Sequence, residues 1–586
     1  MPVSPADPVT QTSLAPPATP PAAPPSAHIA MQARPVARAY AVQGFDELYV
    51  RSPRRWLLLI LAAFVLCASL YAIVTPDWQA PDEPAHYNYI ADIATTGLLP
   101  TLHLGDYNQA TLSALLSTRF MPDDGVETLR YESYQPPLYY LTAAPVYWAS
   151  GGSLRALRFY NIFLGFITLI LLYLSLETVF PNKPLISLGA TAFAALLPMH
   201  VAVTAALNND VLAEMLTMAS ALVLLRWMRP WYGSDANTDW RDGGAGHDRR
   251  LLPLLGVLLG LGMVTKVYAY AVLPMFAVVV LWSVWRKART WAAFWHGVRL
   301  ALLIVLPALL LAAPLWARNL AIYGQWDFLG LHFHDQVVVG QPTTQAWLAN
   351  YGAINYFERA FSLTFRSFWG VFGWLSVAMD ERIYRAALFY TGVLFLGLLW
   401  ASVRLISGPP DTDMDDFQTT VLVTLGLLIV AVVASFVWYN LKFVQHQGRY
   451  FFWGMLAIGT VVALGWREVL HPFQGTITGM IAAVLAGSLL VGVFMGGADG
   501  PFDKWTLLIA ATVAAFLLLQ PLLLIGTDYP HPSRRLENSL RPLAARGAMP
   551  QVLQGARFLA WSAPFVLLFV LNLLAPFWYI APQLAH

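Results

Sequence analysis

The sequence has 586 residues, of which 58% are hydrophobic and only 12% are charged. An average soluble domain carries roughly 25% charged residues, so water is excluded as the main solvent of this chain. The net charge of +2 gives no basis for a nucleic-acid partner, and no run of Lys and Arg is interleaved with aromatic residues. The single cysteine, Cys67, lies inside an apolar run, which excludes disulfides and thiolate metal sites.

The first 50 residues differ in composition from the rest of the chain. They are rich in Pro, Ala and Ser, contain the segment PPAAPP and show no apolar period. Because such a segment cannot bury enough surface to order, a disordered cytoplasmic tail is predicted over residues 1–50. About 55 residues precede the first apolar run, more than a cleavable signal peptide allows, so the first helix is predicted to remain as an anchor.

Apolar runs of about 20 residues recur from Trp56 to the C-terminus, and each is long enough to cross a hydrocarbon core of about 30 Å. The sequence therefore predicts an all-α polytopic membrane protein with about 13 transmembrane helices. The predicted spans begin near Trp56, Leu157, Leu185, Val211, Leu251, Val267, Val298, Ala386, Thr420, Phe451, Gly475, Trp505 and Phe558. The sequence shows no internal repeat, no sizeable soluble domain and no Rossmann-type glycine fingerprint.

The distribution of Lys and Arg orients these spans, because cytoplasmic loops carry an excess of both residues. RSPRR at 51–55 places the N-terminus in the cytoplasm. Alternating crossings then place the basic residues of 226–250, 285–289 and 533–546 on the same side. The sequence thus predicts a multi-pass protein of the plasma membrane with a cytoplasmic N-terminus.

The same topology leaves three segments outside the cytoplasm, at about 76–155, about 318–385 and 440–449. Residues 136–150, PPLYYLTAAPVYWAS, are short, aromatic and led by prolines, so an interfacial helix is predicted there rather than a further span. These segments carry most of the side chains that could catalyse a reaction or bind a substrate. The sequence therefore predicts an active face outside the cytoplasm.

The first external segment opens with the motif PDEPAHYNYI, which contains two adjacent carboxylates at the start of a predicted short helix. Pro84 fits the first turn of that helix, and the spacing of four sets Asp82 near the face that carries His86. A carboxylate beside an imidazole at the membrane surface could accept a proton from a hydroxyl. The alternatives are that Asp82 caps the helix and that Glu83 is a solvated first-turn charge rather than a second acid.

Further polar groups fall at the ends of helices on the same membrane face. They are Asn208, Asn209 and Asp210 before the fourth span, Lys266 after the fifth, Arg318 and Asn319 after the seventh, and His446, Gln447 and Arg449 before the tenth. Ionisable groups near hydrocarbon are costly unless they are paired or functional. Lys266, Arg318 and Arg449 at one depth suit a phosphate or pyrophosphate head group, although each cation alone could simply reach the interface. Asp210 could orient a sugar hydroxyl or cap the next helix.

Two other motifs could be metal sites. His332, His334 and Asp335 in the sequence HFHD could place two imidazoles on one side of a strand, but no cysteine or further acid motif accompanies them. The Asp-rich run at 411–416 lies in a short loop predicted to be cytoplasmic, without a nucleotide-binding domain. We therefore predict no cofactor, with a divalent metal as a minor alternative.

These motifs resemble the GT-C superfamily of integral-membrane glycosyltransferases, specifically family-39-like enzymes related to protein O-mannosyltransferases and aminoarabinose transferases. The resemblance is carried by PDEPAHYNYI at 81–90, QPPLYY at 135–140, NND at 208–210, TK at 265–266, ARN at 317–319 and HQGRY at 446–450. It covers roughly residues 55–470. Residues 51–470 are thus predicted to form a GT-C-like catalytic membrane domain, and residues 471–586 to add further transmembrane helices.

The resemblance implies an inverting transfer of a hexose or pentose from a polyprenyl-phosphate donor to an acceptor hydroxyl at the external face. By motif, Asp82 would be the general base and Glu83 its neighbour. His86, Gln135, Asn209, Asp210, Lys266, Arg318, Gln447 and Arg449 would bind the substrates. Relatives often have Lys where this chain has Gln135, which leaves Lys266 and Arg449 as better candidates for the donor phosphate.

The implied partners are the lipid-linked donor, membrane lipids and an acceptor that could be a glycan, a lipid or a protein. One alternative function is a transporter or flippase of a lipid-linked saccharide, although no inverted repeat or mid-bilayer polar cluster is evident. Another is a non-catalytic partner in glycan assembly, which would not need the acidic pair at 82–83.

Overall fold

The computed structural model describes residues 52–121, 125–181, 183–233, 248–324, 326–407, 414–494, 504–527 and 531–585. The predicted disordered tail at 1–50 and residues 411–413, half of the Asp-rich run at 411–416, lie outside these ranges. Helices make up nearly all regular structure of the described residues, which confirms the all-α class predicted from the apolar runs.

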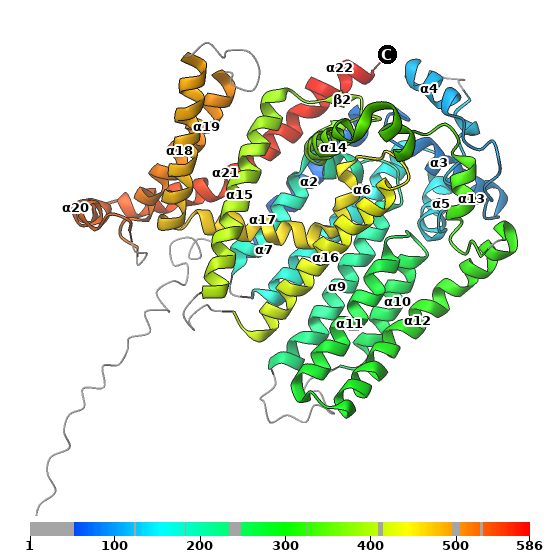
Figure 1. Cartoon of the computed structure of the whole chain (residues 1–586), viewed down its shortest axis with the longest axis horizontal. Coiled ribbons are helices and arrows are strands. Elements are labelled where there is room, and N and C mark those ends of the chain that lie inside the picture. The colour runs from blue at the N-terminus through cyan, green and yellow to red at the C-terminus, as the bar shows by residue number, and fades with distance from the viewer. Residues whose placement is uncertain are drawn as a thin grey trace, which may run out of the picture.

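Eleven helical segments of the described chain are long and apolar enough to cross a membrane, which makes this a multi-pass membrane protein. They are built on α2 (Pro53–Val74), α6 (Leu154–Val179), α9 (Asp210–Gly233), α11 (Ala269–Ala288), α12 (Trp291–Tyr323), α15 (Glu381–Ser407), α16 (Asp416–Asn440), η3 (Gly448–Gly454) with α17 (Met455–Val469), α18 (Pro472–Phe494), α19 (Lys504–Leu519) with η4 (Gln520–Leu524), and α21 (Met549–Ala575) with η5 (Pro576–Ile580) and α22 (Ala581–Leu584). Figure 1 shows many of them running side by side as one bundle.

Two predicted spans depart from this regular form. α7 (Pro184–Leu196) and α8 (Pro198–Thr204) are bent by 65°, because Pro198 forces Leu197 out of the helical conformation. Counted as one span, the pair raises the total to 12. α10 (Leu251–Met263) has 13 residues, or about 20 Å, which is shorter than the hydrocarbon core. The predicted count of about 13 is therefore not confirmed, although each predicted start lies in a helix or within two residues of one.

The connections of the bundle carry a second set of shorter or irregular elements. They are α3 (Glu83–Thr96), α4 (Gln109–Ser117), η2 (Val126–Thr128), α5 (Leu138–Ser150), α13 (Leu331–Val337), α14 (Thr344–Gly370) and α20 (Arg534–Ala544). α3, α4, α5, α13 and α14 gather at one end of the bundle, in the upper right of Figure 1. α5 has 13 residues and is not among the candidate spans, in agreement with the prediction for 136–150.

A short hairpin follows α14, in which β1 (Val371–Phe372) pairs antiparallel with β2 (Val377–Ala378). Its register sets Val371 opposite Ala378 and Phe372 opposite Val377. Both residues of β1 are buried in the main apolar core, together with residues of α2, α7, α9, α17 and α21. The hairpin therefore ties the loop helices to the bundle core.

α21 also belongs to this core, although it lies after the boundary predicted at residue 470. Trp561 and Phe565 of α21 are buried in the main cluster, and the Asn572 amide donates to the Leu196 carbonyl at 2.7 Å. α18 and α19 also share a small separate cluster around Ala486 and Ala510, while Leu517 of α19 belongs to the main cluster. The last helix thus completes the core of the preceding region.

Candidate functional site

Asp82 stands at the N-terminus of α3, directly before Glu83. Pro84 lies in the first turn, where a missing amide donor costs no hydrogen bond, and Gly97 ends the helix in the left-handed conformation. Asp82 itself has a φ of 65°, a conformation that Asp tolerates better than most residues. The Asp82 side chain makes no capping hydrogen bond, so the alternative role of a helix cap is not observed.

The Asp82 carboxylate instead joins two residues that are distant in sequence. Arg449 Nη2 donates to Oδ2 at 2.6 Å, and the Tyr131 hydroxyl donates to Oδ1 at 3.0 Å. Burial by itself raises the pKa of the Asp82 carboxyl, but the charge and hydrogen bond of Arg449 more than offset this effect, so the pKa lies below its ordinary value. Asp82 is therefore held as an anion.

Glu83 is completely buried and binds Arg158 through both carboxylate oxygens. Arg158 Nε donates to Oε1 at 2.9 Å, and Nη2 donates to Oε2 at 2.6 Å. The amides of Trp78 and Leu207 donate to Oε2 and Oε1 at 3.2 and 3.1 Å. The alternative of a solvated first-turn charge is therefore wrong. With four donors on two oxygens, Glu83 is suited to holding structure rather than to accepting a proton as a second acid.

Arg158, in the first turns of α6, completes this buried connection. Its guanidinium also donates to three carbonyl groups at the end of α2, where a helix leaves its acceptors unsatisfied. These acceptors belong to Ala72, Thr75 and Pro76, at 3.0, 2.7 and 3.0 Å. The pair of Glu83 and Arg158 thus links α2, α3, α6 and the turn before α9, and it fixes the backbone on which Asp82 stands.

A second cluster joins four of the predicted binding residues. Lys266 Nζ donates to Asn209 Oδ1 at 2.6 Å and lies 3.1 Å from Asp210 Oδ1. The Asn209 amide donates to Gln135 Oε1 and to the Thr265 carbonyl, both at 3.3 Å. Three segments of the chain therefore meet at Lys266, as the motifs predicted, and Gln135 takes part through Asn209.

The charges of both ion pairs, Asp82 with Arg449 and Asp210 with Lys266, act on the His86 imidazole. Its Nδ1 forms a hydrogen bond of 2.9 Å with the Tyr140 hydroxyl, rather than with Asp82. Burial, followed by the positive charge of Lys266, lowers the pKa of His86 to about 3. The imidazole is therefore neutral, and it is suited to hydrogen bonding rather than to carrying charge.

Glu132 is a carboxyl group of this site that the sequence analysis missed. The residue is 8% exposed, and its Oε2 is buried without a hydrogen-bond partner. Burial, together with repulsion from the Asp82 charge, raises the pKa of Glu132 to about 7. The available signal was an acid flanked by Tyr131 and Tyr134 directly before QPPLYY, because an aromatic setting favours a perturbed carboxyl.

Arg318 and Gln447, two further predicted binding residues, make their hydrogen bonds to other partners than the residues around Asp82 and Lys266. Arg318 donates to the carbonyls of Leu99 and Pro100 at 3.4 and 2.6 Å and to Asn319 Oδ1 at 3.2 Å. Arg318 thus binds backbone carbonyls after α3, whereas Lys266 and Arg449 pair with the carboxylates of Asp210 and Asp82. The Gln447 amide donates to Gln445, while its own Oε1 is buried without a partner.

The HFHD motif lies in α13, so the predicted strand spacing of its imidazoles is wrong. His332 lies beside Gln336, and Asp335 pairs with His334 and Lys442. Across the described residues, no group of three His, Cys, Asp or Glu could hold a metal ion.

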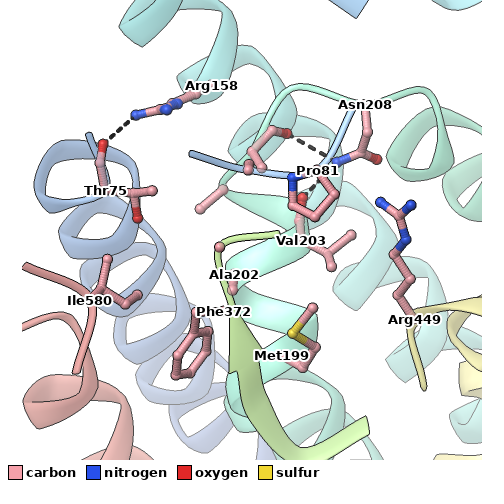
Figure 2. A pocket seen from close by; sticks show the side chains of 14 residues that line it. Thr75, Pro81, Arg158, Met199, Ala202, Val203, Asn208, Phe372, Arg449 and Ile580 are labelled. Carbon is pink, nitrogen blue, oxygen red and sulfur yellow. Dashed lines mark hydrogen bonds between the residues drawn. The ribbon is translucent and has the colours of Figure 1, made fainter. Parts of the chain in front are cut away.

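A small pocket of about 40 Å³ lies beside the Asp82 loop, with Arg158 at one edge and Arg449 at the other (Figure 2). Its wall is mainly apolar and includes Met199, Ala202, Val203, Phe372 and Ile580. The volume admits a few water molecules, since one needs about 10–15 Å³. Arg449 Nε is buried without a hydrogen-bond partner, so this guanidinium keeps one donor for a further group.

Comparison with known proteins identifies part of this region. The family model described as dolichyl-phosphate-mannose-protein mannosyltransferase matches residues 127–321. The matched segment contains Glu132, Gln135, Asn209 and Lys266. No curated protein sequence matches the chain.

Solved structures of low sequence identity were also found. ArnT from Cupriavidus metallidurans in the apo state is 16% identical, with 88% of this chain and 77% of that chain covered and a TM-score of 0.43. The same protein bound to undecaprenyl phosphate is 14% identical, with the same coverage and a TM-score of 0.39. The apo oligosaccharyltransferase of Archaeoglobus fulgidus is 11% identical over 84% of this chain and 58% of that chain, with a TM-score of 0.39. The family model thus agrees, over residues 127–321, with the resemblance to protein O-mannosyltransferases that the motifs indicated.

Proposed function

We propose that this protein is a glycosyltransferase that moves a sugar from a polyprenyl-phosphate donor to an acceptor hydroxyl, with inversion at the anomeric carbon. The observation that carries the proposal is the pair of carboxylate–cation contacts, Asp82 with Arg449 and Asp210 with Lys266, in one polar cluster at one end of the membrane helices. The match to a family named for transfer from dolichyl-phosphate-mannose supports this donor class.

The donor phosphate is assigned to the two cations. Lys266 supplies a compact charge and Arg449 a planar guanidinium with an unpartnered Nε, the groups that proteins use to bind phosphate. The polyprenyl chain would lie among the apolar helices. As the bond from the anomeric carbon to the phosphate oxygen breaks, these cations stabilise the negative charge left on polyprenyl phosphate.

The acceptor hydroxyl is assigned to Asp82. The acceptor oxygen attacks the anomeric carbon from the side opposite the phosphate, which inverts its configuration, and its proton passes to the Asp82 carboxylate. Glu83 acts with Arg158 to hold Asp82 in position. His86 and Gln447 are assigned to hydroxyl groups of the sugar, Gln135 and Asn209 to orienting Lys266, and Arg318 to holding the segment after α3.

The location of the reaction follows from the predicted topology. We assign the site to the extracytoplasmic face of the plasma membrane, with the N-terminus in the cytoplasm, and the acceptor to a glycan, a lipid or a protein. The division into a 1–50 tail, a 51–470 catalytic region and further helices at 471–586 stays a prediction. We assign no resident metal to the reaction, because Lys266 and Arg449 would supply the positive charge at the phosphate.

Sugar transfer in isolated membranes tests the proposal. Radiolabelled polyprenyl-phosphate hexoses and pentoses are incubated with wild-type protein, Asp82→Asn and the control Asp106→Asn, which alters another acid of the same segment. Wild type and the control should transfer sugar, and Asp82→Asn should lose about 10²–10⁴-fold of the rate. Donor binding without transfer by the wild type would instead favour a transporter.

A further inference from the structure

Glu132 is the one acidic side chain of the site whose carboxylate has a buried oxygen without a partner. Asp82 is bound by Arg449 and Tyr131, Glu83 by Arg158 and two amides, and Asp210 by Lys266. A buried polar atom without a partner costs free energy, so its retention points to use by a proton or a substrate.

The electrostatic setting of Glu132 differs from that of Asp82. Its pKa is raised to about 7 by burial and by the Asp82 charge, whereas the pKa of Asp82 lies below its ordinary value because of Arg449. A proton taken up by Asp82 therefore has a more favourable place on Glu132. In many enzymes, two neighbouring carboxyl groups have different pKa values because their surroundings differ, and each then takes a different role in proton transfer.

We propose that Glu132 is the carboxyl group that keeps the acceptor proton after Asp82 has withdrawn it, so that the two carboxylates act as one proton-transfer pair. This inference rests on the proposed glycosyl transfer. The O–H bond of the acceptor breaks as the bond to the anomeric carbon forms and the phosphate leaves with its electron pair. The proton ends on Glu132, which becomes a neutral carboxylic acid and later releases the proton to water.

The groups that act on Glu132 come from several elements. The charged ones are Asp82 before α3, Lys266 between α10 and α11, and Arg449 in η3. The Gln135 side chain also acts on the carboxyl, and the phenol groups of Tyr131, Tyr134, Tyr140 and Tyr439 lie within electrostatic reach. Ionised Glu132 is thus required to start a cycle, and the rate should rise with pH as this group loses its proton.

The test is the pH dependence of kcat for purified protein in liposomes, with a donor that the wild type uses. Wild type should show a rate that rises tenfold per pH unit below about pH 7 and then levels off. Glu132→Gln keeps the shape of the side chain but cannot take up the proton. It should lower kcat about tenfold or more, leave the donor KM within about threefold, and remove the rise with pH. Glu132→Asp should restore that rise.

The exposed Glu127→Gln, in the same segment, serves as the control and should behave as wild type. An unchanged profile in Glu132→Gln would overturn the inference while leaving the proposed transfer intact. Absence of transfer in wild type would instead overturn the proposed function itself. If Glu132→Gln does not fold, a wild-type rate that stays flat across about pH 5–9 would still contradict the inference.

Discussion

Arg158 and Arg449, which bind the adjacent carboxylates of Glu83 and Asp82, differ in whether a guanidinium donor is left for a ligand. Every contact described for the Arg158 guanidinium goes to Glu83, to Asp77 or to the end of α2, and its side chain is 1% exposed. Arg449 keeps a buried Nε without a partner. Arg158 is therefore assigned to structure and Arg449 to the ligand, although both pair with carboxylates adjacent in sequence.

The structural role of Arg158 predicts a large loss of stability. Arg158→Ala leaves the Glu83 charge buried without its partner, which costs about 3–5 kcal/mol. Arg155→Ala, in the same helix but exposed, should change the stability by no more than about 0.5 kcal/mol. Thermal unfolding of the purified proteins in detergent compares the two. Equal melting temperatures would show that the buried pair contributes little to the fold.

Lys266 is expected to act on donor affinity. Lys266→Met keeps the length and apolar stem of the side chain but removes the charge from the proposed phosphate site, so the donor KM should rise about tenfold or more. Lys442→Met, at a half-exposed lysine paired with Asp335, is the matched control and should leave KM unchanged. An equal KM in both variants would exclude Lys266 from the phosphate site.

Removal of divalent metal ions tests whether Lys266 and Arg449 alone supply the positive charge at the proposed phosphate site. Because Lys266 and Arg449 are assigned to the phosphate, incubation with EDTA should leave the rate of sugar transfer unchanged. Loss of transfer with EDTA and its recovery with a divalent cation would show that the two cations do not suffice.

At the scale of elements, the helices pack through close backbone contacts at glycine. A Cβ added to Gly397 of α15 would lie 2.1 Å from the Gly465 carbonyl oxygen of α17. Gly392, also in α15, has open space at its Cβ position. Small residues that let helix backbones approach are typical of interfaces between membrane helices.

These two glycines give opposite predictions for alanine substitution. Gly397→Ala should destabilise the protein by about 1–3 kcal/mol because backbone atoms must move apart. Gly392→Ala should be neutral or stabilising by up to about 1 kcal/mol, since Ala favours the helix. Urea-induced or thermal unfolding in one detergent compares both variants. Equal destabilisation would contradict the close approach of α15 and α17.

The helices were predictable because their signal is local. An apolar run such as 53–74 contains its own evidence for a span, whereas the 13 residues of α10 are too few to cross the hydrocarbon core. The sequence analysis missed the amphipathic α14 for two reasons. The helix is interrupted at Gly352, which has a φ of 78°, and it contains many polar residues. The bend at Pro198 could have been anticipated from the proline alone.

The site was less predictable because its contacts join distant parts of the chain. Asp82 and Arg449 are 367 residues apart, and their common membrane face was the only guide to their contact. The same argument could not show that Arg318 donates to the Leu99 and Pro100 carbonyls, because a shared face does not fix side-chain contacts. Glu132 and Arg158 carry no motif, so their roles emerge from burial and hydrogen bonds.

Across the whole molecule, the predicted orientation can be tested with new cysteines. Cys67 is completely buried, so the wild type should give little background with a membrane-impermeant maleimide. Glu127→Cys should react in intact cells, and Arg535→Cys should react only after permeabilisation, because both positions are exposed but lie on opposite predicted sides. The reverse pattern would place the site in the cytoplasm.

The central claim is that the polar cluster around Asp82 transfers sugar from a lipid phosphate. The most direct measurement is the release of free polyprenyl phosphate from a polyprenyl-phosphate sugar by purified wild-type protein and Asp82→Asn in liposomes with an acceptor. We predict release matched by a product of inverted configuration in wild type, and almost none in the folded variant. Equal release by both proteins would contradict the assigned role of Asp82, and no release by wild type with any donor would contradict the claim itself.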